Sequence, residues 1–294
     1  MRLVVFGAAG FLGSHVADQL SEEGHTVVLY DKRPSPYRRP DQEEWLGDIL
    51  DQDQVELATS GCDVIYNFAA LADLNAAMTA PVDTVQKNIL GNCIVLEAAR
   101  KNKVRRYIYA STVYVNSRHG GFYRCSKQAA EQYVEQYQSS YDLDFTILRY
   151  GSLYGPRSDS TNGLYRIVAN ALKEGTVRYH GSPGAMREYI HVEDAARASV
   201  EALGESFRNQ SFVLTGQEPM SVLDMHKMLA EVLGLPCELN ATPDHEQGHY
   251  VRTPYAYQPR RGFKYIPPQH VDLGQGLVEL AHEVATKERL NDDP

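Results

Sequence analysis

The sequence predicts an α/β protein built on a doubly wound parallel sheet, followed by a smaller C-terminal α/β lobe. Short apolar runs without polar alternation recur through the first half of the chain, as in strands buried on both faces. Each run is followed by a stretch with helical periodicity, and this alternation makes neighbouring strands parallel. A glycine cluster at 7–13 follows the first run, where a strand would turn into a helix.

The expected elements follow one another through residue 155. The strand segments are rich in β-branched and aromatic residues, and the helical stretches carry apolar residues at three- and four-residue spacing. Strands are expected at 2–7, 25–31, 62–70, 105–112 and 144–155, and helices at 11–24, 82–103 and 123–142.

The stretch YGPRSDSTNG at 154–163 interrupts this pattern and indicates a domain boundary near residue 156. We expect residues 1–156 to form the first domain and residues 157–294 to form mainly the smaller lobe. Helical and strand character returns at 187–203 and 211–216, so residues 185–215 are expected to pack back on the first domain.

Composition and charge exclude several classes of function. With 43% hydrophobic and 23% charged residues among 294, the chain reads as globular, and its formal charge of −9 argues against a nucleic-acid partner. No apolar run reaches the ~18 residues of a membrane span, so no membrane partner is expected. The 4 cysteines lack a CxxC spacing and the 10 histidines lack ligand spacing. We therefore expect free thiols, no metal site and a soluble, cytoplasmic protein.

Three glycines at the first strand–helix junction predict a Rossmann-like dinucleotide-binding loop. Gly7 allows a tight turn, Gly10 lets a pyrophosphate approach the backbone, and Gly13 lets the helix close on the sheet. The spacing is GxxGxxG, and the helix N-terminus offers free N–H groups to phosphates. Residues 1–156 are therefore expected to bind a dinucleotide.

Asp31, at the end of the next strand, predicts which dinucleotide binds. A carboxylate at this position bonds both ribose hydroxyls and repels the 2′-phosphate of NADP, so we expect NAD. Lys32 and Arg33 follow directly and could neutralise a 2′-phosphate, which leaves NADP as the alternative.

Further motifs extend the pattern along the chain. They are GAAGFLG at 7–13, GDI at 47–49, NFAAL at 67–71, Asn88, ST at 111–112, YRCSK at 123–127, RYGSLYGP at 149–156 and REYIHVEDAA at 187–196. In this order they resemble the extended short-chain dehydrogenase/reductase family, specifically its nucleotide-sugar epimerase/dehydratase branch. The resemblance covers most of the chain and is strongest over 1–200. It implies a substrate-binding role for the lobe at 157–294 and a nucleotide-diphosphate sugar as substrate.

The resemblance also implies where the cofactor lies. Asp48 and Ile49 would hold the adenine, Ala69 to Leu71 would line the middle of NAD, and Lys127 would hold the nicotinamide ribose. The full set of implied cofactor residues is Gly7, Gly10, Phe11, Leu12, Gly13, Asp31, Lys32, Asp48, Ile49, Phe68, Ala69, Ala70, Leu71, Asn88, Tyr123, Lys127 and Tyr150.

Thr112, Tyr123 and Lys127 are the expected catalytic residues. Tyr123 and Lys127 lie four apart on one face of an expected helix, and the lysine charge would pull the phenol pKa down from about 10. Thr112 ends the preceding strand and would share the proton of a substrate hydroxyl with Tyr123. A Tyr–Lys pair at this spacing is common by chance. The pair indicates catalysis only because the dinucleotide loop and the strand-end threonine accompany it.

Expected substrate contacts follow from the same resemblance. They are Val113, Ser152, Asn162, Tyr179 and Arg187. Arg187 matches the family arginine that clamps the diphosphate, which suits a bidentate guanidinium, whereas Ser152 replaces the usual asparagine.

Two departures from the family pattern bear on the reaction. The segment between Thr112 and Tyr123 is short, and dehydratase relatives carry an Asp–Glu pair where this chain has Val113 and Tyr114. Without those acids, 4,6-dehydration loses its proton donor and acceptor.

These features together predict an NAD-dependent nucleotide-sugar 4-epimerase that oxidises C4 transiently and returns the hydride to the other face. The alternatives are a nucleotide-4-keto-sugar reductase or dehydrogenase with net NAD(P)H turnover, a 4,6-dehydratase, and a cofactor-sensing protein without catalysis. Amphipathic stretches at 83–101 and 123–141 match the helices through which relatives dimerise, so a homodimer is expected.

Overall fold

The computed structural model describes residues 1–182, 184–241 and 249–255. These residues all belong to one compact unit, Met1–Gln258. The predicted lobe at 157–294 therefore lies partly outside the described residues, and its extent stays a prediction.

Seven parallel strands form the main sheet, in the order β11-β6-β5-β4-β1-β2-β3. The chain adds strands outward from β1 to β3 on one side, then returns to add β4, β5, β6 and β11 on the other. This is the predicted doubly wound arrangement, which is confirmed. The strands are β1 (Arg2–Phe6), β2 (Thr26–Asp31), β3 (Glu43–Leu46), β4 (Val64–Asn67), β5 (Arg106–Thr112), β6 (Asp144–Tyr150) and β11 (Gln210–Leu214).

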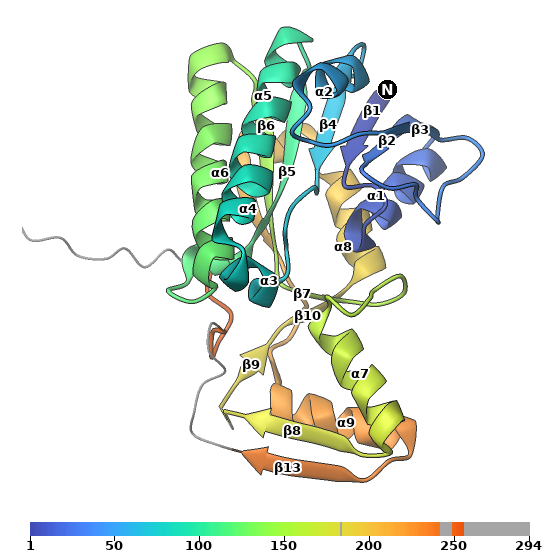
Figure 1. Cartoon of the computed structure of the whole chain (residues 1–294), viewed down its shortest axis with the longest axis vertical. Coiled ribbons are helices and arrows are strands. Elements are labelled where there is room, and N and C mark those ends of the chain that lie inside the picture. The colour runs from blue at the N-terminus through green and yellow to red at the C-terminus, as the bar shows by residue number, and fades with distance from the viewer. Residues whose placement is uncertain (183, 242–248, 256–294) are drawn as a thin grey trace, which may run out of the picture. The chain divides into compact units, whose positions relative to one another are not determined.

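Helices cover both faces of this sheet (Figure 1). One face carries α2 (Gln52–Thr59), α5 (Gly91–Lys101) and α6 (Gly121–Tyr141), and the other carries α1 (Phe11–Glu22) and α8 (Val192–Glu201). Because the central strands are enclosed on both sides, their side chains are apolar without alternation, as in the fully buried run of β4.

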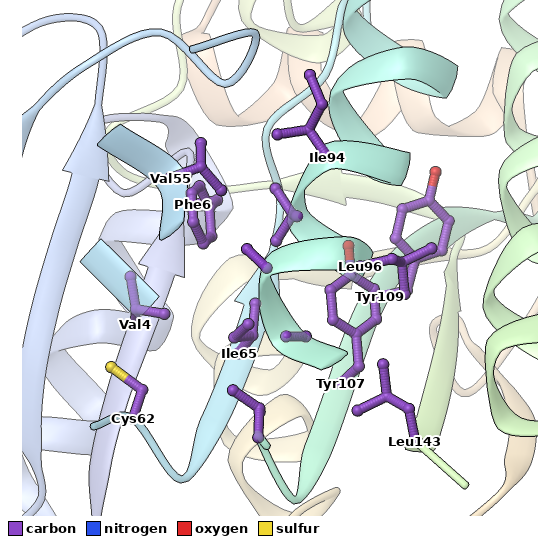
Figure 2. Close-up of a cluster of buried hydrophobic side chains, with 14 of the residues drawn as sticks. Val4, Phe6, Val55, Cys62, Ile65, Ile94, Leu96, Tyr107, Tyr109 and Leu143 are labelled. Carbon is purple, nitrogen blue, oxygen red and sulfur yellow. The ribbon is translucent and has the colours of Figure 1, made fainter. Parts of the chain in front are cut away.

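The core on the α5 side is drawn in Figure 2. Val4 and Phe6 of β1 pack with Val55 of α2, while Leu96 of α5 reaches Tyr107 of β5. The tyrosine rings fill volume, and the Tyr107 hydroxyl donates to Asn92 Oδ1 at 2.7 Å, so its polar end is satisfied inside the core.

Two expected elements are broken in the structure. The strand predicted at 144–155 ends at Tyr150 and resumes as β7 (Ser152–Tyr154), which leaves the main sheet to pair with β10 (Tyr189–His191). The helix predicted at 82–103 comprises α4 (Pro81–Val85), a π-helical turn η1 (Gln86–Leu90) and α5. The strand β3 and the helix α2 were not predicted.

After β7, the elements α7 (Gly163–Glu174), β8 (Val177–Gly181), α9 (Val222–Leu233) and β13 (Cys237–Ala241) form a smaller layer (Figure 1). Strand β8 pairs with β13, and Ala171 of α7, Val177 of β8 and Ala230 of α9 form a separate small core. No helix among the described residues is both long enough and apolar enough to cross a membrane. The other described elements are α3 (Leu74–Thr79), η2 (Val113–Asn116), β9 (Met186–Arg187), η3 (Glu205–Phe207) and β12 (Met220–Ser221).

Candidate active site

The loops after β1 and β4 meet at the point where the strand order reverses, which is where open α/β sheets bind ligands. Gly7 has φ +80, and a Cβ there would lie 2.8 Å from Ala69 N. A Cβ on Gly13 would lie 2.2 Å from the Gly7 carbonyl oxygen. Only glycines allow this close packing, so the loop can present its backbone to a diphosphate at the N-terminus of α1.

Asp31 lies at the end of β2, beside this loop. Its Oδ2 accepts a hydrogen bond from Ala9 N at 3.0 Å, and its Oδ1 accepts one from Arg33 N at 3.4 Å. These bonds fix the carboxylate at the position expected for the ribose contact, whereas the Lys32 side chain is exposed. Phe11 and Leu12 follow the loop in the first turn of α1. The arrangement fits a bound dinucleotide.

Asp48 and Ile49 lie beyond the end of β3. Asp48 is exposed, and its Oδ1 accepts from Leu50 N at 2.9 Å. Ile49 packs toward α5, so closely that a Cβ on Gly91 would lie 2.9 Å from Ile49 Cγ2. The Asp48 side chain therefore shapes a turn at this edge of the sheet, where an adenine contact is expected.

Asn88 joins the cofactor loop after β4 to helix α6. Its Oδ1 accepts from Leu71 N at 2.7 Å, and its Nδ2 donates to Leu71 O at 3.1 Å and to Ser126 Oγ at 2.9 Å. Asn88 lies in the π-helical turn η1, which shifts the helix register and turns this amide into the interior. Phe68, Ala69 and Ala70 are partly buried beside it.

The three expected catalytic residues come together at the carboxyl end of β5. Thr112 is the last residue of β5, and Tyr123 and Lys127 lie on the first turns of α6. Lys127 Nζ lies 6.0 Å from the centroid of the Tyr123 ring, and it donates to Ala110 O at 2.7 Å. It also lies 4.6 Å from the Tyr109 ring centroid.

Burial changes the pKa values of both titrating groups. It raises the pKa of Tyr123 to about 12, although a hydrogen bond with the Thr112 side chain acts in the opposite direction. It lowers the pKa of Lys127 to about 7, against the attraction of the Glu131 carboxylate. Each group is thus poised to change protonation when charge is added or removed nearby.

The short segment between Thr112 and Tyr123 is closely held. It turns at once into η2, and Gln128 Nε2 donates to Val115 O at 2.8 Å while Arg124 Nη1 donates to Ser117 O at 3.2 Å. Both donors belong to α6, so the segment is hydrogen-bonded to the helix that carries Tyr123 and Lys127.

Arg187 lines a small cavity of about 30 Å³ together with Tyr179, His249 and Tyr250. Its guanidinium lies 4.5 Å from the Tyr250 ring centroid, and its Nη1 donates to Tyr250 O at 2.7 Å and to Met186 O at 2.9 Å. Ser152 lies in β7, opposite Tyr189 of β10. Arg187 is therefore oriented by its neighbours, as a diphosphate contact requires.

Three predicted residues are buried or hydrogen-bonded within the fold. The Val113 side chain is 1% exposed, and Tyr150 is buried with its hydroxyl bonded to Ser199 Oγ at 2.6 Å. Asn162 caps α7, accepting from Tyr165 N at 3.1 Å and donating to Leu153 O at 2.8 Å. Val113 thus packs inside the protein, and the polar atoms of Tyr150 and Asn162 form hydrogen bonds within it.

The sequence-based interpretation missed several residues beside the site. Tyr114 shares a 2.7 Å hydrogen bond with His249 Nδ1, and its ring packs against Tyr250. Arg157 lines a cleft beside the dinucleotide loop. Tyr114 follows Val113 and Arg157 follows the motif at 149–156, so their positions next to predicted site residues could have indicated them. The contact of Tyr114 with His249 joins residues far apart in the sequence, and no motif predicts it.

Comparisons with known proteins show the family of this chain. A family model described as the NAD dependent epimerase/dehydratase family matches residues 3–214. The chain is 32% identical over 265 residues to UDP-glucose 4-epimerase of Mycolicibacterium smegmatis, covering 81% of this chain and 84% of that protein. It is 24% identical over 315 residues to a dTDP-glucose 4,6-dehydratase of an Actinoplanes species, covering 95% of this chain and 96% of that one.

Among solved structures, that of Thermus thermophilus UDP-glucose 4-epimerase in complex with NAD matches with a TM-score of 0.76 and 26% identity. The match covers 90% of this chain and 95% of that one. A dinucleotide loop, an acidic β2 terminus and a Thr–Tyr–Lys cluster thus occur in a chain that a family model matches over most of its length. This chain belongs to the NAD-dependent epimerase/dehydratase family, and it is an NAD-dependent enzyme of the extended short-chain dehydrogenase/reductase type.

Proposed function

We propose that the enzyme is a nucleotide-sugar 4-epimerase. The composition of the catalytic cluster carries this proposal: it supplies a phenol, an ammonium and a hydroxyl, and the two positions after Thr112 are Val113 and Tyr114. In dehydratase relatives these positions hold the acids that remove water. A cluster that can move a proton at one hydroxyl, without acids for a second elimination step, suits reversible oxidation at C4.

Tyr123 removes the proton from the C4 hydroxyl of the sugar, and the Thr112 hydroxyl orients that oxygen. The Lys127 ammonium supports the phenolate electrostatically and holds the nicotinamide ribose. NAD held by the glycine loop and Asp31 would supply a reversible hydride acceptor for C4 of the sugar. Arg187 holds the diphosphate, so the sugar ring can turn while the nucleotide stays in place.

UDP-glucose is the first substrate to test, because a 32% identical relative is named a UDP-glucose 4-epimerase. We expect conversion to UDP-galactose by proton NMR, with no accumulation of absorbance at 340 nm. A steady gain or loss at 340 nm would instead identify a reductase or dehydrogenase. A 4-keto-6-deoxy product would identify a dehydratase, and absence of any change across UDP-, dTDP-, GDP- and CDP-sugars would contradict catalysis.

A homodimer is part of the proposal. Exposed apolar side chains gather on α4, η1 and α6, which pack against one another. They are Val82, Val85, Leu90, Phe122 and Tyr133. Matching helices form the dimer interface that the family resemblance implies, so a second copy of this chain would cover them.

A cytoplasmic location is also proposed. All four cysteines are free in the structure, and burial raises the pKa of the Cys62 and Cys93 thiols, which keeps them unreactive. Fractionation of cells that express the tagged protein tests this, and recovery outside the cytoplasmic fraction would contradict it.

A further inference from the structure

A cleft of about 330 Å³ lies beside the dinucleotide loop, and three separate segments line it. The first segment is the loop itself, with Ala9 and Phe11. The second follows β2 and contributes Arg33 to Tyr37, and the third follows β7 and contributes Arg157 to Asp159. Asp31, whose carboxylate accepts from Ala9 N, ends the strand that leads into the second segment. The cleft thus adjoins the expected ribose and diphosphate positions of NAD.

The third segment is bonded to helix α1, which follows the first segment, and its Arg157 contacts the second segment. Arg157 Nη2 donates to Asp18 Oδ2 of α1 at 2.7 Å, and its guanidinium lies 4.4 Å from the centroid of the Tyr37 ring. One residue earlier, the Pro156 carbonyl accepts from His15 Nε2 at 3.0 Å. The Arg157 and Asp18 side chains are only 24% and 18% exposed, so solvent screens this pair less than a surface pair.

Arg157 has further bonding capacity at the same place. Its Nη1 is buried and has no hydrogen-bond partner among the described residues. A buried guanidinium N–H without an acceptor is costly, and an anionic or hydroxyl oxygen in the adjoining cleft would satisfy it. The Asp31 carboxylate, by contrast, already accepts from two backbone N–H groups. Arg157 is therefore a donor positioned for a ligand of the cleft.

We propose that Arg157, held by Asp18 and Tyr37, forms a clasp that retains NAD on the enzyme. The guanidinium donates to the adenosine ribose–diphosphate part of the cofactor. The ion pair between Arg157 and Asp18 of α1 bridges the chain segments on either side of the cofactor. Release of NAD then requires both the ligand contact and the bridge to break, so the clasp acts mainly on the dissociation rate. Retention suits an enzyme that regenerates its cofactor in each turnover, but it does not depend on which sugar reacts.

The test measures NAD release from the purified full chain without any sugar. Protein loaded with radiolabelled NAD is freed of excess label, chased with unlabelled NAD, and sampled by filter retention over time. Arg157→Met, which keeps the side-chain stem but loses the guanidinium, is expected to release NAD at least tenfold faster than wild type. Tyr37→Leu is expected to give a smaller acceleration. The control Arg178→Met, which removes an exposed arginine of β8 that lies outside the cleft, is expected to release NAD at the wild-type rate.

A second variant separates the clasp from a folding defect. Asp18→Asn leaves Arg157 in the chain but removes the charge that holds it, and it should also accelerate release, by less than Arg157→Met. Thermal melting and circular dichroism establish that each variant is folded. Wild-type release rates in folded Arg157→Met or in Asp18→Asn would overturn the proposal, as would equal acceleration by Arg178→Met. Failure of the epimerase assignment would leave these rates unaffected.

Discussion

At the scale of single residues, burial shifts the pKa values of the two proposed catalytic groups, Tyr123 and Lys127, toward their uncharged forms. With a pKa of about 12, Tyr123 is a neutral phenol at pH 7, while a pKa of about 7 leaves Lys127 partly uncharged. Both shifts have burial as their largest cause. A phenolate beside an ammonium would offset part of the cost of burial for both groups, because each charge then stabilises the other. Tyr123 is thus suited to hold its proton in the free enzyme and to release it when substrate and cofactor enclose the site.

Replacing Tyr123 by phenylalanine removes the acid–base group and keeps the ring. We expect Tyr123→Phe to lose turnover by at least about 10³-fold, in line with the loss of a general base, while it still co-purifies with NAD. Turnover is measured as epimer formation, and bound NAD is measured by chromatography of the denatured protein.

The matched control is Tyr141→Phe, an exposed tyrosine of the same helix outside the proposed dimer surface. It should keep turnover close to wild type. Wild-type turnover in Tyr123→Phe, or loss of NAD from it, would show that Tyr123 serves another purpose.

Lys127 should make folding stability depend on pH in a defined window. Below pH 7 the lysine is protonated in both states, and the folded protein carries the cost of a buried charge. Between about pH 7 and 10.5 the folded lysine is neutral while the unfolded one still binds a proton, so stability rises with pH. Each unit of pKa difference corresponds to about 1.4 kcal/mol.

Lys127→Met removes this dependence. The stability of the variant relative to wild type should be highest at pH 6 to 7 and should fall as pH rises toward 10. Urea unfolding of both proteins, after removal of bound nucleotide, gives the two curves. Parallel curves across this range would mean that Lys127 is not held with a lowered pKa.

At the scale of elements, helix α6 is anchored to the sheet by a nearly buried ion pair. Arg149 of β6 donates to Glu131 through Nε at 3.0 Å and through Nη2 at 2.8 Å. The Glu131 side chain is 9% exposed, and it also supports the charge of Lys127. Together with the bond from Asn88 to Ser126, this pair fixes the helix that carries Tyr123.

Breaking the pair on one side should be costly. Arg149→Met leaves Glu131 buried without its partner, and we expect a loss of about 3–5 kcal/mol in the free energy of unfolding. The double variant Glu131→Leu with Arg149→Met should recover much of this loss, since no unpaired charge remains. Urea unfolding measures both.

An exposed pair provides the control. Arg100→Met removes the partner of Glu97 on the surface of α5 and should change stability little. If Arg149→Met costs no more than Arg100→Met, the anchoring role of the pair is wrong.

The same elements show what sequence alone could predict. Buried parallel strands are recognisable in the sequence as apolar runs. The Gly7 loop and the Tyr123–Lys127 spacing are also local patterns, which can be recognised without knowing the tertiary structure. The break at Gly151 and the π-helical turn at Asn88 could not be predicted, because packing against distant chain decides both. The Cβ of a residue at 151 would lie 2.8 Å from Thr215 Cγ2, for example. Val113 and Asn162 were expected to contact the substrate from the family resemblance; in the structure Val113 is buried and Asn162 caps α7.

At the scale of the whole molecule, the site is assembled from segments far apart in the chain. Loops after β1, β4 and β5 meet at one edge of the sheet, and segments after residue 150 bring Arg157 and Arg187 toward it. Each sequence motif identifies one group of residues at this edge, but not which other groups lie beside it. The parallel sheet then brings them together, because the carboxyl ends of all its strands lie on the same side.

The proposed dimer is a prediction at this scale. Leu90→Glu places a charge in the exposed apolar surface of α4, η1 and α6, and it should shift the protein from dimer to monomer in analytical ultracentrifugation. Val232→Glu, on the exposed surface of α9, is the matched control and should leave the dimer intact. A wild-type monomer, or equal effects of both variants, would contradict the proposed interface.

The most direct test of the central claim follows the hydrogen at C4. UDP-glucose carrying deuterium at C4 is incubated with the enzyme until the epimers reach equilibrium, and the products are examined by NMR and mass spectrometry. A 4-epimerase of this type predicts UDP-galactose that retains deuterium at C4, with no change in absorbance at 340 nm. Loss of the deuterium to solvent or to added cofactor, or a product lacking the C6 oxygen, would contradict the account.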